Sequence, residues 1–198
     1  MGQIVVVENV TLDGVMQSPG RADEDVRGGF AHGGWAVPYA DHVMAATMGK
    51  GMTAEGVLLF GRRTYEDFHR SWAGRTDGNP YTEVLNRRRK FVASRTLAEP
   101  LPWANSAVIR GDFGRLKAEV SGDIAVLGSG ELVRTLLAEG LVDVLTLSVH
   151  PLTLGSGTRL FDGGPHRFEL VETIPTSTGV LIATYRAVGG QAPLATFA

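Results

Sequence analysis

The chain has 198 residues, of which 43% are hydrophobic and 20% charged, with a formal net charge of −2 and no cysteine. These values are typical of one globular domain, and they give no overall attraction to nucleic acid or to an anionic membrane. The lack of cysteine excludes disulfides, thiolate metal sites and a cysteine nucleophile, which agrees with a reducing compartment such as the cytoplasm. No stretch approaches the roughly 18 apolar residues that span a bilayer, and the N-terminus lacks the pattern of a signal peptide.

Strand-like and helix-like segments alternate along most of the chain, which predicts a layered α/β domain. In chain order, the expected elements are a strand at Ile4–Val10, a helix at Tyr39–Met48, a strand at Val57–Phe60, helices at Arg63–Ser71 and Tyr81–Arg88, strands at Phe91–Ala93 and Ala107–Ile109, a helix at Phe113–Val120, a strand at Ile124–Leu127, a helix from Leu132 to Gly140 and a strand at Val144–Val149. Because helices separate most successive strands, the centre of the sheet is expected to be parallel.

The last third of the chain has a different pattern. Two strands, Phe168–Ile174 and Val180–Val188, flank a turn-rich segment, which predicts a hairpin and therefore an antiparallel edge on the sheet. The sequence shows no linker, so residues 1–188 are expected to form a single domain, and the Gly-, Ala- and Pro-rich residues 189–198 a flexible tail.

One junction between a strand and a helix has almost no side chains. The strand Ile124–Leu127 leads through Gly128-Ser129-Gly130 into a helix that begins near Glu131 and Leu132. Glycine lets the backbone approach a ligand, and the first N–H groups of a helix are unpaired at the positive end of its dipole. The junction is therefore a candidate phosphate site, although an ordinary αβ connection has the same appearance.

A second junction repeats this pattern with added charge, because the strand Val57–Phe60 leads into Gly61-Arg62-Arg63-Thr64. Two guanidinium groups can bind phosphate oxygens in a forked geometry, and Thr64 at a helix start can offer its hydroxyl and its N–H. The alternative is that both arginines are solvated surface charges and that Thr64 is only an N-cap.

A third junction, Ser94-Arg95-Thr96, follows the strand Phe91–Ala93 and places two hydroxyls beside a guanidinium. The carboxyl ends of parallel strands lie along one side of an open sheet, where cofactors usually bind. A ligand with several phosphates, such as a dinucleotide that carries a 2′-phosphate, would use all three junctions.

Other polar motifs are less specific. Asp13-Gly14 after the first strand is typical of a tight turn, and with Leu12 its backbone could line a flat ring such as nicotinamide. The five histidines form no i, i+4 pair, so no metal site is predicted. The basic run 87–90 stands at a helix end, where cations favour the dipole, and is expected to be a solvated face.

Taken in this order, the motifs resemble the dihydrofolate-reductase-like family, and more closely its branch related to the reductase domain of bacterial riboflavin biosynthesis. The resemblance rests on Thr11–Gly14, Gly61–Glu66, Ser94–Leu97, Gly128–Leu132, and Leu141–Asp143 followed by His150-Pro151 and Leu154–Gly157. It implies a three-layer α/β/α sandwich around a mixed, mostly parallel sheet of about eight strands. It also implies that NADPH lies across the strand ends.

The resemblance also implies roles for individual residues. The phosphates of NADPH would be held by Gly61, Arg62, Arg63 and Thr64, its 2′-phosphate by Ser94, Arg95 and Thr96, its pyrophosphate by Gly128, Ser129, Gly130, Glu131 and Leu132, and its nicotinamide would lie near Leu12, Asp13 and Gly14. Ser148 matches a strand position that faces a pterin-like substrate.

The chain departs from the family pattern at two points. True dihydrofolate reductases have an acidic residue on the first helix that binds the pterin ring; Asp41 follows Trp35 and Pro38 here, but its distance from Gly61 is too long by several residues. Asp41 is therefore either a substrate ligand or a helix N-cap. The zinc-binding deaminase half that accompanies the riboflavin reductase in fused enzymes is absent, since the chain has no cysteine.

We therefore expect an NADPH-dependent reductase that transfers hydride to a small heterocyclic or ribosylaminopyrimidine-type substrate, as 5-amino-6-(5-phosphoribosylamino)uracil reductase does. The alternatives are a dihydrofolate reductase and a nucleotide-binding protein of this fold without turnover. No side chain stands out as an acid, so the proton is expected to come through water. A homodimer is expected by family analogy alone, with neither nucleic acid nor a membrane as partner.

Overall fold

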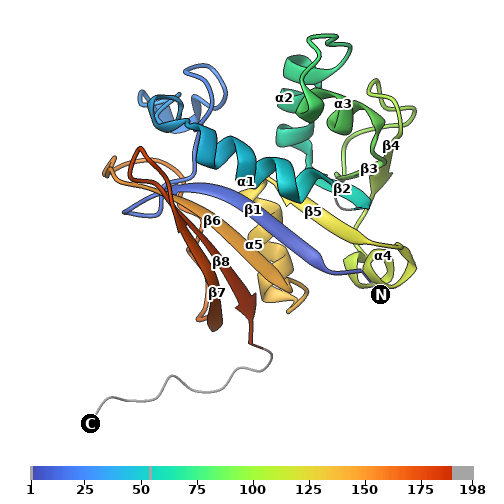
Figure 1. The fold of residues 1–198 in the computed structure, drawn as a ribbon. Helices are drawn as coiled ribbons and strands as arrows, with labels where there is room; N and C mark the ends of the chain where they lie inside the picture. Colours follow the sequence, from blue (N-terminus) through green and yellow to red (C-terminus); the bar gives the residue numbers. More distant parts are fainter. Residues whose placement is uncertain (1, 54, 189–198) are drawn as a thin grey trace.

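The computed structural model describes residues 2–53 and 55–188 and builds them around one eight-stranded sheet of order β4-β3-β2-β5-β1-β6-β8-β7 (Figure 1). Its strands are β1 (Ile4–Thr11), β2 (Gly56–Gly61), β3 (Lys90–Ala93), β4 (Ser106–Ile109), β5 (Asp123–Leu127), β6 (Val144–His150), β7 (Phe168–Pro175) and β8 (Leu181–Ala187). The pairs from β4 through β6 are parallel, whereas β8 is antiparallel to both β6 and β7. The predicted mixed sheet, with a parallel centre and a C-terminal antiparallel hairpin, is confirmed.

Helices cover both faces of the sheet, so the fold has three layers (Figure 1). They are α1 (His42–Thr53), α2 (Arg62–Trp72), α3 (Pro80–Arg87), α4 (Phe113–Glu119) and α5 (Gly130–Ala138). Leu116 of α4 and Val133 of α5 pack on one face against Val6 of β1. Tyr65 of α2 and Leu85 of α3 pack on the other face.

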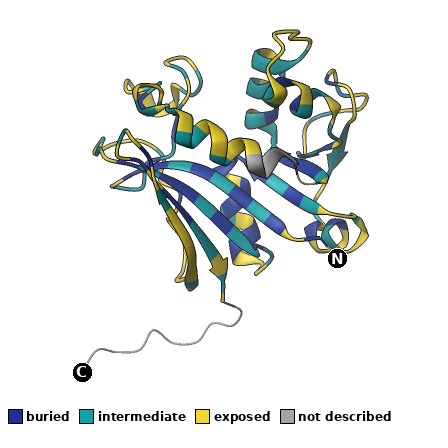
Figure 2. Cartoon of the chain, in the orientation of Figure 1, coloured by how far each residue is buried: buried dark blue, intermediate teal, exposed yellow. Residues whose placement is uncertain are grey.

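Burial follows the alternation expected of strands in such a sandwich (Figure 2). In β1, Ile4 and Val6 are fully buried and Val10 nearly so, on the face that α4 and α5 cover. The same alternation places Glu8 on this face, where it is 2% exposed. A carboxyl group thus occupies an apolar register position of the central strand.

The first helix begins later than its pattern predicts. The expected range was Tyr39–Met48, whereas α1 covers His42–Thr53 and Val37–Tyr39 forms a separate 3-10 turn. Ala40 is extended, and the carboxylate of Asp41 accepts a hydrogen bond from the Met44 N–H at 2.8 Å. Asp41 therefore acts as the N-cap that fixes the start of α1.

The basic run is not a solvated face throughout, because Lys90 is fully buried at the start of β3. Its ammonium group donates to the backbone oxygens of Asn86, Arg88 and Ala104 and lies 4.6 Å from the centre of the Trp103 ring. Burial lowers the pKa of Lys90 to about 8. The expectation was wrong at this position, because the carbonyl groups at the end of α3 and a nearby loop supply the solvation that water would give.

Candidate functional site

The three glycine- or hydroxyl-rich junctions meet in one cleft of about 880 Å³ at the carboxyl ends of β3, β2 and β5. The cleft is lined by Gly61–Thr64, by Ser94–Thr96 and by Gly128–Leu132, which are the residues that the sequence singled out for phosphate binding. They come together because neighbouring parallel strands end at the same edge of the sheet. The strand order places the junctions in a row, with Ser94 at one end and Gly128 nearer to β1.

Two hydroxyl groups tie the β2 and β5 junctions together. Thr64 donates through Oγ1 to the Gly128 carbonyl at 2.8 Å, and Ser129 Oγ accepts from the Gly61 N–H at 3.0 Å while donating to the Leu127 carbonyl at 3.1 Å. These hydroxyls hold the two loops in register. The groups left for an anion at this point are therefore mainly backbone N–H groups.

Two helices start at the cleft, α2 at Arg62 and α5 at Gly130. The first N–H groups of a helix lack partners within the helix and lie at its positive end. Gly128 has φ of +58°, a left-handed conformation that favours glycine, and a Cβ on Gly130 would overlap the side chain of Met16. Gly128 thus permits a tight turn, and Gly130 permits the close approach of the Met16 side chain, beside two helix starts that favour anions.

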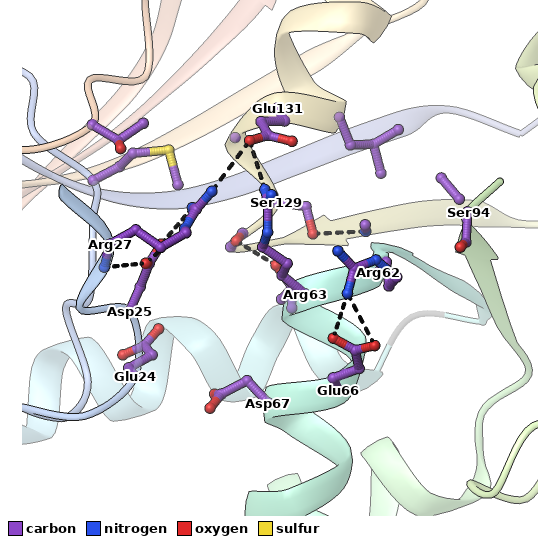
Figure 3. Close-up of a pocket in the computed structure, with 18 of the residues that line it drawn as sticks. Glu24, Asp25, Arg27, Arg62, Arg63, Glu66, Asp67, Ser94, Ser129 and Glu131 are labelled. Carbon is purple, nitrogen blue, oxygen red and sulfur yellow. Dashed lines mark hydrogen bonds and ion pairs between the residues drawn. The ribbon is translucent and has the colours of Figure 1, made fainter. Parts of the chain in front are cut away.

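Three guanidinium groups that line the cleft, those of Arg27, Arg62 and Arg63, are held by carboxylates (Figure 3). Glu131 at the start of α5 accepts from Arg63 at 2.7 Å and forms a longer ion pair of 3.5 Å with Arg27. Arg62 pairs with Glu66 one helical turn later at 3.0 Å. These side chains are about half exposed, and exposed ion pairs contribute little, so a phosphate can compete for the arginines.

The β3 junction is a braced turn with an exposed cation. Ser94 Oγ accepts from the N–H groups of Thr96 and Leu97 at 3.2 and 3.0 Å. Arg110 donates to the backbone oxygens of Arg95 and Leu97 at 2.9 and 3.1 Å. Arg95 is exposed beside the cleft, and no described carboxylate pairs with it. Its charge is therefore open to an anion.

At its β1 end the cleft is lined by Glu8, Asn9, Met16 and Thr158. The pairing of β1 with β5 ends at Val7 and Leu127, so the next residues of β1 border the cleft on that side while they stay paired with β6 on the other. Burial raises the pKa of Glu8 to about 8; the Ser129 N–H opposes this shift and the nearby Glu24 adds to it. Glu8 is not among the site residues predicted from the sequence, although an acidic residue at an inward position of an apolar strand was the available signal.

Leu12, Asp13 and Gly14 are not among the residues that line the cleft. The Asp13 carboxylate accepts from the Thr11 hydroxyl at 2.6 Å and from the N–H groups of Leu154 and Gly155, and these contacts lower its pKa to about 2. Asp13 thus clamps the loop after β6 to the end of β1. A role of these residues beside a nicotinamide stays a prediction.

Asp41 and Ser148 also lie outside the cleft lining. Besides capping α1, Asp41 accepts at 2.6 Å from both the N–H and the hydroxyl of Ser177, and its pKa falls to about 2, mainly through that hydroxyl. Ser148 is buried on β6. Two residues further on, the buried ring of His150 packs edge-on against Trp35 and Tyr39. Two residues along β6 from Ser148, the His150 ring is thus already in contact with two aromatic rings.

In residues 2–53 and 55–188, no group of three or more histidine, aspartate or glutamate residues could hold a metal ion. None of the helices in this part of the chain is long and apolar enough to cross a membrane.

The sequence of the chain matches a family model and is similar to that of a bacterial protein. The family model of the RibD C-terminal domain matches residues 3–182. The uncharacterized protein YyaP of Bacillus subtilis (strain 168) is 30% identical over 138 residues, which cover 65% of this chain and 72% of YyaP.

Three solved structures share the fold. A protein from Shewanella sp. PV-4, provisionally assigned to riboflavin biosynthesis, has a TM-score of 0.66 at 18% identity and covers 96% of this chain and 100% of its own. A pyrimidine reductase-like protein from Corynebacterium diphtheriae has a TM-score of 0.64 at 14% identity, and the match covers 96% of this chain and 93% of that protein. Dihydrofolate reductase from Enterococcus faecalis, complexed with NADP(H) and RAB-propyl, has a TM-score of 0.61 at 15% identity, and the match covers 94% of this chain and 96% of the reductase.

Proposed function

The chain belongs to the RibD C-terminal domain family, and on this basis we propose that it is a reductase that uses NADPH to reduce a C=N or C=O bond of a small heterocyclic substrate of the ribosylaminopyrimidine type. The observation that carries the proposal is the row of three anion-favouring junctions in one cleft, ordered β3, β2 and β5.

The residues of the cleft fit the groups of a dinucleotide 2′-phosphate. The starts of α2 and α5 suit the pyrophosphate, with Arg62 and Arg63 as further donors. Ser94, Arg95 and Thr96 lie one strand further on, where a 2′-phosphate on the adenosine would reach the guanidinium of Arg95, which pairs with no carboxylate of the described residues. This assignment leaves the β1 end, with Glu8 and Asn9, for the other nucleoside and the substrate.

NADPH supplies the hydride when bound, so the protein contributes binding, orientation and electrostatics. We call the segments after β2 (Gly61–Thr64) and after β5 (Gly128–Leu132) the phosphate loops. Thr64 and Ser129 hold them at a fixed separation through their hydrogen bonds to Gly128 and Gly61. Fixing the loops in this way reduces the ordering that binding would otherwise require.

Dihydrofolate is a less favoured substrate on two observations. The carboxylate of Asp41 is engaged by the start of α1 and by Ser177, and the ring of His150 packs against Trp35 and Tyr39 beside Ser148. A pterin ring that contacts Asp41 and Ser148 would have to displace these contacts. The homodimer stays a prediction, which sedimentation at micromolar concentration tests.

Calorimetry with NADPH and NADH, followed by loss of NADPH absorbance with candidate substrates, tests the proposal. We expect NADPH to bind more tightly than NADH, and turnover with a ribosylaminopyrimidine but not with dihydrofolate. Absence of binding at millimolar NADPH would falsify the proposed function. Tight binding without consumption by any candidate substrate would favour the nucleotide-binding protein instead.

A further inference from the structure

Glu8 is a buried carboxyl group with an incomplete set of hydrogen bonds. It lies between Val6 and Val10 on the inward face of β1 and is 2% exposed. The Ser129 backbone forms a hydrogen bond to the carboxyl group, whereas Oε1 has no partner among the described residues. Burying a polar atom without a partner is unfavourable, and a valine at this position would continue the apolar face. The fold alone therefore gives no reason for this carboxyl group.

The position of Glu8 in the cleft gives such a reason. Along the cleft, the order of the strands runs from Ser94 after β3, through the phosphate loops of β2 and β5, to Glu8 and Asn9 in β1. If the proposed dinucleotide has its 2′-phosphate at Ser94 and its pyrophosphate between the two helix starts, its reactive ring reaches β1. Glu8 lies at that end, directly beside the N-terminus of α5.

Burial, with a smaller contribution from a neighbouring charge, keeps the proton on Glu8 at neutral pH. Burial is the main cause, and the carboxylate of Glu24 on the neighbouring loop acts in the same direction. Arg27 and Arg63, which also line the cleft, pair with other carboxylates: Arg27 with Asp25 and Glu131, and Arg63 with Glu131. The Ser129 N–H favours the charged form but does not outweigh burial, so the pKa of Glu8 is about 8. Glu8 is therefore a hydrogen-bond donor at pH 7.

We infer that Glu8 is the proton donor of the reduction, an assignment that rests on the proposed function. The substrate carbon accepts hydride from the dihydronicotinamide, and the electron pair of its double bond moves to the attached nitrogen or oxygen. That atom takes the proton from Oε1 of Glu8, whose O–H bond breaks to leave a carboxylate. Water returns a proton to Glu8 after product release, so one NADPH and one proton are consumed for each substrate reduced.

The location also couples the two charges that the reaction creates. A bound oxidised cofactor would bring a cationic nicotinamide ring to this end of the cleft, where loss of the proton makes Glu8 anionic. Opposite charges in a site of low dielectric stabilise each other. It follows that NADP⁺ lowers the pKa of Glu8 and releases its proton on binding, whereas uncharged dihydronicotinamide does not.

Proton release on binding tests this directly and needs no substrate. Calorimetry at pH 7 in buffers of different ionisation enthalpy counts the protons released when NADP⁺ or NADPH binds. We expect the wild type to release most of one proton with NADP⁺ and almost none with NADPH. Glu8→Gln, which keeps the shape and can still accept from the Ser129 N–H, should abolish this difference. Glu172→Gln, an exposed isosteric change on β7, should leave it intact.

Two more measurements keep the failure of this inference distinct from that of the proposed function. Carbon NMR of the carboxyl groups, with Glu8 assigned by its loss in Glu8→Gln, should show a titration midpoint near 8 in the free protein. With a reducible substrate, Glu8→Gln should keep the NADPH affinity but lose on the order of 100-fold in kcat, and its rate should no longer fall above pH 8.

The outcomes separate clearly. A normal carboxyl midpoint, or equal NADP⁺-linked proton release in Glu8→Gln and wild type, overturns the role of Glu8 while leaving NADPH binding as a proposed function. Failure of the wild type to bind either form of the dinucleotide overturns both. Circular dichroism of Glu8→Gln confirms that the variant is folded before these results are compared.

Discussion

The two ends of the cleft differ in how deeply their ionisable groups are buried. Near β2 they are the half-exposed guanidinium groups of Arg62 and Arg63, whereas near β1 it is the buried carboxyl group of Glu8. Water screens the arginines, so they provide attraction that depends on salt and on competing carboxylates. Burial prevents such screening of Glu8 and changes its protonation instead. In the proposed function, the groups that bind and the group that reacts thus differ in the depth at which they lie in the cleft.

The largest effect is expected at the buried end. Between pH 4.5 and about 8 the folded protein holds a proton on Glu8 that the unfolded chain has released, so the free energy of unfolding falls as pH rises through this window. The loss is about 1.4 kcal/mol per pH unit, on the order of 5 kcal/mol in total. Urea denaturation at several pH values should show this slope in the wild type, and Glu8→Gln should remove it. Parallel curves for the two proteins would mean that Glu8 titrates as it does in water.

The exposed end should respond through affinity. Replacing Arg62 and Arg63 together by alanine removes two charge-assisted donors from the phosphate loops, and we expect NADPH to bind about 100-fold more weakly. Calorimetry measures the change, and added salt should reduce the gap between variant and wild type. Arg115→Ala, which breaks an exposed ion pair with Glu119 on α4, is the matched control. An unchanged dissociation constant would remove the two arginines from the binding site.

Arg95 should affect the choice of dinucleotide more than overall affinity. We expect Arg95→Ala to weaken NADPH binding about 10-fold and to leave NADH binding unchanged, because only NADPH carries the 2′-phosphate. Competition of the two dinucleotides with a fluorescent nucleotide measures both constants in one experiment. An equal loss for NADPH and NADH would place the 2′-phosphate elsewhere in the cleft.

The smallest effect concerns the ion pairs that occupy the arginines. Glu131→Gln releases Arg63 and Arg27 from a shared carboxylate, so NADPH affinity should rise by about 2- to 5-fold, in line with the small contribution of exposed pairs. Glu131 also lies in the first turn of α5, where a negative charge favours the helix dipole, so stability should fall by about 0.5 kcal/mol. Weaker NADPH binding in Glu131→Gln would instead make the carboxylate part of the ligand contact.

Local patterns predicted most of the scaffold. The strand ranges agree with the structure to within one residue at each end, because apolar runs of strand length specify strands with little help from distant parts of the chain. The helix that contains Tyr39 was placed too early, since its start depends on the Asp41 cap and on contacts with Ser177, 136 residues away. Lys90 was misjudged for a similar reason, because the carbonyl groups that solvate it come partly from Ala104.

The candidate site divides in the same way. Gly61–Thr64, Ser94–Thr96 and Gly128–Leu132 could be singled out because each carries its own chemistry in a few adjacent residues. The hydrogen bonds from Thr64 to Gly128 and from Gly61 to Ser129 could not be foreseen, since these residues are more than 60 positions apart. Glu8 was overlooked because burial, and not a neighbouring motif, gives it an unusual protonation state.

Sequence alone was sufficient for the α/β alternation, the three anion-favouring junctions and the family resemblance, since each depends on residue types at short spacing. The tertiary structure added the row of junctions across the strand ends, the carboxylates that hold the arginines, and the buried carboxyl at β1. The physical reason is range: backbone preferences act over a few residues, whereas desolvation and ion pairing depend on whichever groups the sheet order brings within a few ångströms.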